Sequence, residues 1–257
     1  IIHLTRCFDS EKIQNVNKYV DPIRDLEIIE TEILLSDLES VQKRLEKSNK
    51  KKLEKDELIF LEECLKLISS GKKPVELKKR YNKDLIKKSA LLSLKPRIIV
   101  CNVDEKSLPV GNKYSDVCKK KFSDENIITV CADIEDQIMG LQTKDRKDFM
   151  QESGIKSTGL DNLIKTGYDT LGLSTFFTSG PEESRAWTIE KNAKAVDAAG
   201  VIHSDFKKKF IRAETATHED FIKYKGFNEC KNAGKLRLEG KDYSVNDGDV
   251  MYFRVGS

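Results

Sequence analysis

The sequence lacks the marks of a secreted, zinc-binding or membrane-spanning protein. Its six cysteines include no Cys-x-x-Cys pair, so we expect reduced thiols, a cytoplasmic location and no metal site. No apolar run approaches the length of a transmembrane helix, and the first residues do not resemble a signal peptide. We therefore expect no membrane partner.

A strong net charge is also missing. The chain has 46 basic and 43 acidic side chains, a formal net charge of +3, so its overall field neither favours nor opposes binding to nucleic acid. Hydrophobic residues make up 38% of the 257 positions, which is enough for proper cores and for two domains. These proportions predict a globular protein.

A short apolar run at residues 98–101 is the feature around which the chain is organised. It is rich in β-branched residues, follows Pro96 and stops at the polar sequence 102–105, which predicts a buried strand of a parallel sheet. Ligands of α/β folds bind at the carboxyl ends of such strands. Asn102 there can hold a purine ring, and Glu105 can accept hydrogens from the edge of the base. The alternative is an Asn-rich turn without a ligand.

A second strand of the same kind is predicted at residues 127–131. It ends beside Ala132, before a helical segment. If the two strands are neighbours, the backbone amides of Cys131 and Ala132 lie near the same base.

The segment between the first strand, residues 1–8, and the strand at 98–101 is predicted to be helical. Asp21 and Pro22 are typical of a helix start, and apolar residues three or four apart follow as far as Leu45. A second apolar stripe continues the pattern, so we expect an antiparallel helical hairpin, and then a third helix that returns the chain to the sheet. The apolar stripe lies at 58–68, and the third helix is predicted at 77–93.

The sequence changes character at Leu171. Short strand-like segments then alternate with turn residues, which predicts a compact α+β module of ordinary domain size. The expected strands are 174–178, 185–189, 209–215, 242–245 and 250–255, with a helix at 194–199.

Two lysine-rich segments are candidates for contacts with phosphate groups. Each has an alternative without a ligand, since the first can be a solvated turn and the second a charged sheet edge. Aromatic residues flank the second segment and are expected to pack inside. The candidates are Lys50, Lys51 and Lys52 at the hairpin tip, and Lys207, Lys208, Lys209 and Arg212 in the last module.

Several ordered runs resemble the YchF or Obg-like ATPase family across nearly the whole chain. Val-Asp-Pro-Ile-Arg-Asp at 20–25 is similar to the family's entry to its helical arm, and Asn-Val-Asp-Glu at 102–105 to its base-recognition motif. Five further runs resemble the TGS domain of the family. They lie at 185–189, 199–206, 210–214, 239–243 and 245–250.

The resemblance implies an α/β P-loop nucleotide domain, interrupted by an antiparallel coiled-coil arm and followed by a TGS domain of the ubiquitin-like β-grasp type. It also implies hydrolysis of ATP or GTP with magnesium, association with the ribosome or ribosomal RNA, and no DNA sequence specificity. The nucleotide-binding residues would be Asn102, Val103, Glu105, Cys131 and Ala132. The implied domains are 1–20 and 94–170 for nucleotide binding, 21–93 for the arm and 171–257 for the TGS domain.

One departure from the family concerns the phosphates. No part of the sequence reads G-x-x-x-x-G-K-[ST], the loop that cradles phosphates, so we expect an amino-terminal truncation, no catalytic or metal-binding residue in this chain and no hydrolysis by it alone. The base motif also differs from the Asn-Lys-x-Asp of GTPases. Glu105 is one methylene longer than Asp, and Val103 replaces the lysine that packs on the base, which favours ATP.

A rival hypothesis is a non-catalytic module in which the basic arm and the TGS domain bind RNA or protein. A cysteine- or histidine-based enzyme has little support, because no His with an orienting partner can be placed beside Cys101 or Cys131.

Overall fold

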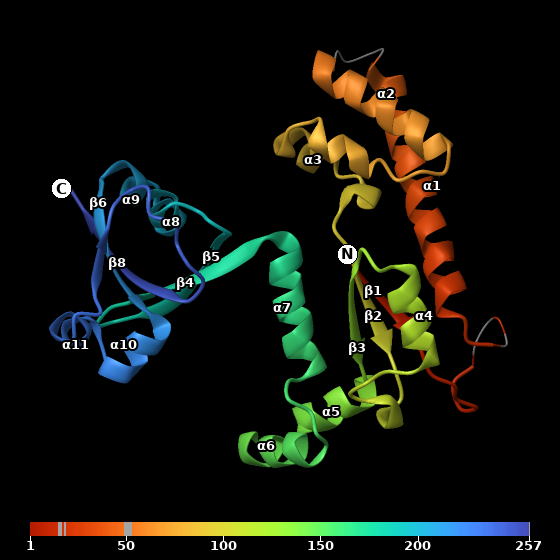
Figure 1. Ribbon diagram of the computed structural model, residues 1–257. Coiled ribbons are helices and arrows are strands. Elements are labelled where there is room, and N and C mark those ends of the chain that lie inside the picture. Colours follow the sequence, from red (N-terminus) through yellow and green to blue (C-terminus); the bar gives the residue numbers. More distant parts are fainter. Residues whose placement is uncertain (15–16, 18, 49–52, 257) are drawn as a thin grey trace. The chain divides into compact units, whose positions relative to one another are not determined.

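The computed structural model describes residues 1–14, 17, 19–48 and 53–256, which form two compact units, 1–166 and 167–257 (Figure 1). Within this described part, no helix combines the length and the apolar character needed to cross a membrane.

The amino-terminal unit contains a parallel sheet of three strands. They are β1 (Ile2–Arg6), β2 (Ile98–Asn102) and β3 (Asn126–Val130), in the order β1-β2-β3. The predicted strand at 98–101 is thus confirmed as the central strand, and its first four residues are buried. The sequence places β3 one residue later than the structure does, because Cys131 belongs to the start of the next helix.

Two helices form the predicted excursion between β1 and β2. They are α1 (Pro22–Ser48) and α2 (Lys55–Ser69), and α2 packs against α1 through a buried cluster that includes Val41, Phe60 and Leu61 (Figure 1). Helix α1 begins at Pro22 as predicted, and the carboxylate of Asp21 caps it by accepting a hydrogen bond from the Arg24 amide at 3.0 Å. The hairpin tip at 49–52 lies outside the described residues.

The single helix predicted at 77–93 is wrong. The structure has a 3₁₀ helix η1 (Val75–Lys79), a helix α3 (Lys83–Ser89) and a 3₁₀ helix η2 (Leu92–Leu94). Asn82 starts α3 by accepting a hydrogen bond from the Leu85 amide, and Ala90 ends it in the left-handed conformation, with φ 57°. The apolar residues keep a helical spacing across Asn82 and Ala90, although the backbone leaves the helical conformation at both positions. Their spacing therefore does not predict where the helices end.

The rest of the amino-terminal unit contains helices α4 (Lys113–Lys121), α5 (Ala132–Gly140) and α6 (Thr143–Glu152). Helix α7 (Gly159–Leu171) starts in this unit and continues into the next. The core beside the sheet contains Leu26 of α1, Ile99 of β2 and Ile134 of α5.

The carboxyl-terminal unit has a mixed sheet of five strands in the order β5-β4-β8-β6-β7. Its first strand, β4, runs parallel to its last strand, β8, and the other pairs are antiparallel. The strands are β4 (Leu173–Ser179), β5 (Ser184–Glu190), β6 (Phe210–Thr217), β7 (Arg237–Glu239) and β8 (Asp249–Val255).

The structure corrects the prediction for this unit in three respects. The strand predicted at 242–245 is wrong, because that segment makes only an isolated bridge between Ser244 and Lys194, and β7 pairs with β6 instead. The helix predicted at 194–199 is α8 (Ala195–Ile202). Three short helices were not predicted, namely α9 (Ser204–Lys208), α10 (His218–Tyr224) and α11 (Phe227–Asn232).

Candidate nucleotide-base site

The carboxyl ends of the three parallel strands meet at one edge of the sheet. Arg6 is opposite Asn102, and Asn102 is opposite Val130. Two backbone hydrogen bonds continue the ladder beyond the strands, from the Cys7 amide to the Asn102 carbonyl and from the Val103 amide to the Val130 carbonyl, each 2.8 Å. The backbone on which the candidate residues sit is therefore fixed on both sides.

The side chain of Asn102 joins two of these strand ends. Its Oδ1 accepts a hydrogen bond of 3.0 Å from the amide of Ala132, the first residue of α5. Within the described part of the chain, the Nδ2 group of Asn102 has no hydrogen-bond partner. Three of the residues predicted from the sequence, Asn102, Cys131 and Ala132, are thus together, and Asn102 presents a donor rather than an acceptor.

Glu105 lies on the same edge and is exposed. It starts the 3₁₀ helix η3 (Glu105–Ser107), which is held in part by a hydrogen bond from the Ser107 hydroxyl to the Asp104 carboxylate. Burial raises the pKa of Cys131, backbone hydrogen bonds from Ile134 and Asp133 oppose that rise, and the charges of Asp133 and Glu105 add to it.

The side chain of Val103 is in a different place from the one the motif suggests. It is buried in the core beside the sheet, where it packs with Cys7, Ile99 and Ile134. A side chain in that position contacts no base, and a lysine would not fit there without disturbing the core. Any contribution of Val103 to nucleotide binding is made by its backbone.

A cavity of about 240 Å³ opens beside this edge. Its lining includes Leu108 and Pro109, which follow η3, then Val130 and Cys131, and residues 154–157, 159 and 162. The Glu135 carboxylate forms part of its wall and accepts hydrogen bonds from the Gly159 and Leu160 amides, which start α7. The cavity thus combines apolar and polar lining residues, as small-molecule sites do, and Asn102 and Glu105 are not among them.

Asn112 is a further residue of this edge that the sequence reasoning missed. Its Oδ1 caps α4, while its Nδ2 donates to the Cys7 carbonyl at 2.8 Å and to the Ser107 hydroxyl at 3.1 Å. It therefore ties the end of β1 to η3. The sequence does carry a signal for it, since Asn112 and Ser115 have the spacing of a capping box.

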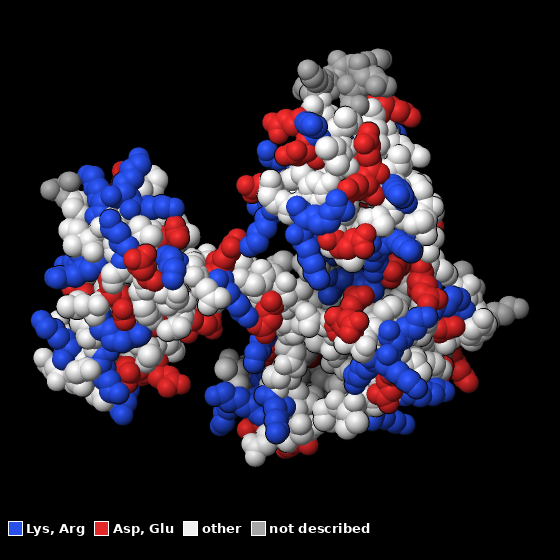
Figure 2. Space-filling model, turned by 45° about the horizontal axis from the view of Figure 1, so that its top comes forward, with Lys and Arg blue, Asp and Glu red and all other residues white. Residues whose placement is uncertain are grey.

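The basic candidates belong to other parts of the chain. Lys50, Lys51 and Lys52 fall outside the described residues. In the carboxyl-terminal unit, Lys207 forms an ion pair with Asp197 at 2.8 Å, and Lys208 lies 3.8 Å from Asp205. Lys209 and Arg212 are exposed, whereas the neighbouring Phe206 and Phe210 pack in the core as predicted. Figure 2 shows basic and acidic side chains interspersed over this unit.

Comparison with known proteins shows which family the chain belongs to. The chain is 43% identical to the ribosome-binding ATPase YchF of Bacillus subtilis, over 99% of this chain and 72% of that protein. The chain belongs to the YchF family. It is also 41% identical to the ribosome-binding ATPase YchF of Haemophilus influenzae, over 98% of this chain and 71% of the relative.

Two further findings bear on this membership. The family model YchF-GTPase_C, described as a protein of unknown function (DUF933), matches residues 173–256. The structure of the Schizosaccharomyces pombe YchF GTPase matches with a TM-score of 0.79 and 32% identity, over 98% of this chain and 71% of that one. The YchF family resemblance and the mixed α/β fold predicted from the sequence are thus confirmed.

Proposed function

We propose that this YchF-family chain provides the base-binding edge and the ribosome-contacting surface of an ATPase. The observation that carries the proposal is the hydrogen bond between Asn102 and the Ala132 amide. It fixes an amide donor at the carboxyl edge of a parallel sheet, where α/β proteins bind nucleotides, with the Glu105 carboxylate exposed beside it.

The two polar groups suit an adenine base. The Nδ2 of Asn102 is a donor for N7, an acceptor that adenine and guanine share, and so it holds a purine without choosing between them. Glu105 is an acceptor only, and adenine offers it an exocyclic amine. We infer that Glu105 discriminates between adenine and guanine and that ATP binds at least as tightly as GTP.

Hydrolysis needs groups that the 257 residues do not provide. Magnesium and the phosphates are held in P-loop proteins by a G-x-x-x-x-G-K-[ST] loop, and no such sequence occurs here. The described residues of the base edge offer the Asn102 amide and the exposed carboxylates of Asp104, Glu105 and Asp133, which include no phosphate-binding loop or lysine of the P-loop kind. We infer that this chain alone is inactive and that ATPase activity requires a chain that contains the loop.

The carboxyl-terminal unit is the proposed ribosome contact, and the relatives named above are called ribosome-binding. We propose that residues 171–257 are a TGS domain of the β-grasp type, which the five-stranded sheet with α8 against it supports. Its phosphate contacts would be Lys207, Lys208, Lys209 and Arg212. Residues 21–93 would be the coiled-coil arm between the two parts of the nucleotide domain, 1–20 and 94–170, and the protein would be cytoplasmic.

Saturation-transfer NMR tests the base site, because it detects weak ligands. We expect the base protons of ATP to receive saturation from the purified chain. Asn102→Asp keeps an oxygen for the Ala132 amide but removes the donor, so it should abolish this signal while the fold is retained. Asp136→Asn, on the exposed side of α5, is the matched control and should change nothing. Equal signals from wild type and Asn102→Asp would refute the base site and favour a module that binds RNA or protein only.

A further inference from the structure

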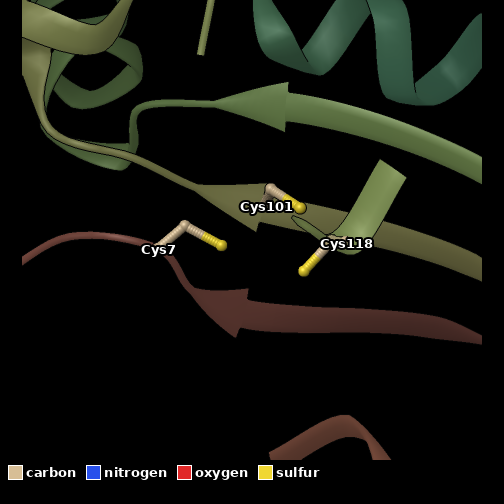
Figure 3. Close-up of side chains that lie close together, drawn as sticks. All are labelled: Cys7, Cys101 and Cys118. Carbon is tan, nitrogen blue, oxygen red and sulfur yellow. The ribbon is translucent and has the colours of Figure 1, made fainter. Parts of the chain in front are cut away.

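Three buried cysteines from three different elements converge in the amino-terminal unit. Cys7 follows β1, Cys101 lies in β2 and Cys118 lies in α4 (Figure 3). Their sulfur atoms all lie within 4.8 Å of one another, and each residue has 0% of its surface exposed. All three thiols are free.

The arrangement differs from that of ordinary core cysteines, which pack singly among carbon atoms. Cys64, Cys131 and Cys230 are also buried, and within the described residues none of them belongs to such a cluster; the Cys230 thiol instead donates to the Asp220 carbonyl at 3.5 Å.

The ligand set decides which kind of ion would fit. It consists of three sulfurs, and within residues 1–14, 17, 19–48 and 53–256 no imidazole or carboxylate joins them. Thiolates select soft ions such as Cu(I) and Zn²⁺, but structural Zn²⁺ is nearly always bound by four ligands. Cu(II) prefers tetragonal nitrogen and oxygen donors, and Mg²⁺ and Ca²⁺ require oxygen.

We propose that Cys7, Cys101 and Cys118 form a three-sulfur binding site for Cu(I). Each Cu–S bond replaces an S–H bond and releases its proton to solvent, and copper keeps its oxidation state throughout. The inference stands on these three residues alone and does not depend on the proposed nucleotide function.

The backbone around the site is already held in place. The Cys7 amide donates to the Asn102 carbonyl, and the Cys7 carbonyl accepts from Asn112, each at 2.8 Å. Cys101 is fixed between β1 and β3 by its position in the central strand. Because the backbone of the site is already ordered, binding costs little conformational entropy, and this favours affinity. Because the site is fully buried, loading must follow local opening and should be slower than diffusion.

An anaerobic titration of the reduced full chain with Cu(I), against the competing chelator bathocuproine disulfonate, tests the proposal. We expect one tightly held equivalent with a thiolate-to-copper absorption band. Cys118→Ala should weaken that equivalent by more than about 100-fold, since loss of an outer-sphere partner already costs about 10 to 100-fold. The control is the double variant Cys64→Ala and Cys230→Ala, which removes two other buried thiols and should retain the equivalent. Equal retention by wild type and Cys118→Ala, or no retention by wild type, would overturn the site.

Copper K-edge X-ray absorption on the loaded wild-type chain keeps the test decisive if Cys118→Ala fails to fold. Three sulfur neighbours around copper are expected. Two sulfurs, or any nitrogen or oxygen bound directly to copper, would contradict the proposed ligand set.

Discussion

Each unit buries an aspartate, and the two carboxylates are used differently. In the amino-terminal unit, Asp37 accepts hydrogen bonds from the Leu92 and Ser93 amides at 2.9 and 2.7 Å and from the Ser93 hydroxyl at 2.6 Å. In the carboxyl-terminal unit, Asp249 pairs with the Arg237 guanidinium at 3.0 Å and accepts from the Tyr243 hydroxyl at 2.7 Å.

Asp37 links two segments that are far apart in the sequence, whereas Asp249 is bound by side chains and backbone close to it in the sequence. Asp37 ties the end of a long helical excursion back to α1, so it determines where the chain re-enters the sheet. Asp249 starts β8, and both of its carboxylate oxygens are already occupied by groups of its own unit. By contrast, the strand ends of the amino-terminal unit keep the Asn102 donor and the Glu105 carboxylate available. The polar groups that hold the fold therefore differ from those that we propose to bind a ligand, because only the former have partners among the described residues.

Removal of the Asp37 carboxylate should have the largest effect. Asp37→Ala leaves two backbone amides of η2 without an acceptor in a largely buried position, and we expect roughly 3 kcal/mol less stability for the amino-terminal unit. Hydrogen exchange should show lost protection around 75–94 and unchanged protection in 173–255. Asp136→Ala, which removes an exposed carboxylate of α5, should be neutral. Loss of protection in both units would show that the anchoring is not local.

Removal of the Asp249 carboxylate should cost less, about 2 kcal/mol, because the Arg237 side chain is 41% exposed and can be resolvated. Urea unfolding followed by the fluorescence of Trp187, the single tryptophan, reports on this unit. Asp249→Asn should fall between Asp249→Ala and wild type. A larger loss for Asp249→Ala than for Asp37→Ala would reverse the comparison.

The proposed ribosome contacts should appear as a salt dependence. If Lys207, Lys208 and Lys209 bind phosphates, replacing them with Ala should lower the slope of log affinity against log salt by about one unit for each phosphate that is no longer neutralised. Ribosome co-sedimentation over a salt series measures it. The charge-matched control replaces Lys223 of α10, Lys231 of α11 and Lys235, which follows α11. Figure 1 shows α10 and α11 at the other end of this unit from α9. Equal slopes in the two triple variants would assign the effect to net charge alone.

The smallest effect concerns His3 in β1. Burial first, and then the charge of Arg97, lower the pKa of His3 below its ordinary 6.5, against the opposing charges of Glu30 and Glu125. Because the folded state holds this proton less well than the unfolded state, stability should fall as pH drops through 6.5, until the lower folded pKa is passed. Stability curves at several pH values should show this loss in wild type and not in His3→Gln. The same pH dependence in both would exclude His3 as its source.

Local signals in the sequence predicted much of the fold. The parallel strands and the start of α1 at Pro22 depend on neighbouring residues, and the structure has a strand or a helix where those signals lie. The boundary predicted near Leu171 falls instead between residues 166 and 167 in the division into two compact units. The helix predicted at 77–93 failed because Asn82 caps the start of a separate helix and Ala90 ends that helix in the left-handed conformation. Asp37, 55 residues from Leu92, then holds the amides of η2. Periodicity alone contains no information about such a partner.

The site was predicted less completely than the fold. Asn102 and Ala132 were foreseen at one edge because parallel strands end together, but the orientation of side chains was not. The buried position of Val103 and the link through Asn112 depend on packing that appears only in three dimensions. The cluster of Cys7, Cys101 and Cys118 was missed for the same reason, since its members are far apart in sequence and match no metal-binding spacing.

The central claim is that the Asn102 and Glu105 edge binds a purine base and that Glu105 favours adenine. Competition between ATP and GTP, measured by saturation-transfer NMR on wild type and Glu105→Gln, tests it most directly. We predict that wild type binds ATP at least as tightly as GTP. Glu105→Gln should lower the ATP-to-GTP preference roughly tenfold, the scale of one hydrogen bond to a charged group. An identical ratio in the two proteins would contradict the role of Glu105 and would mean that another part of the edge selects the base.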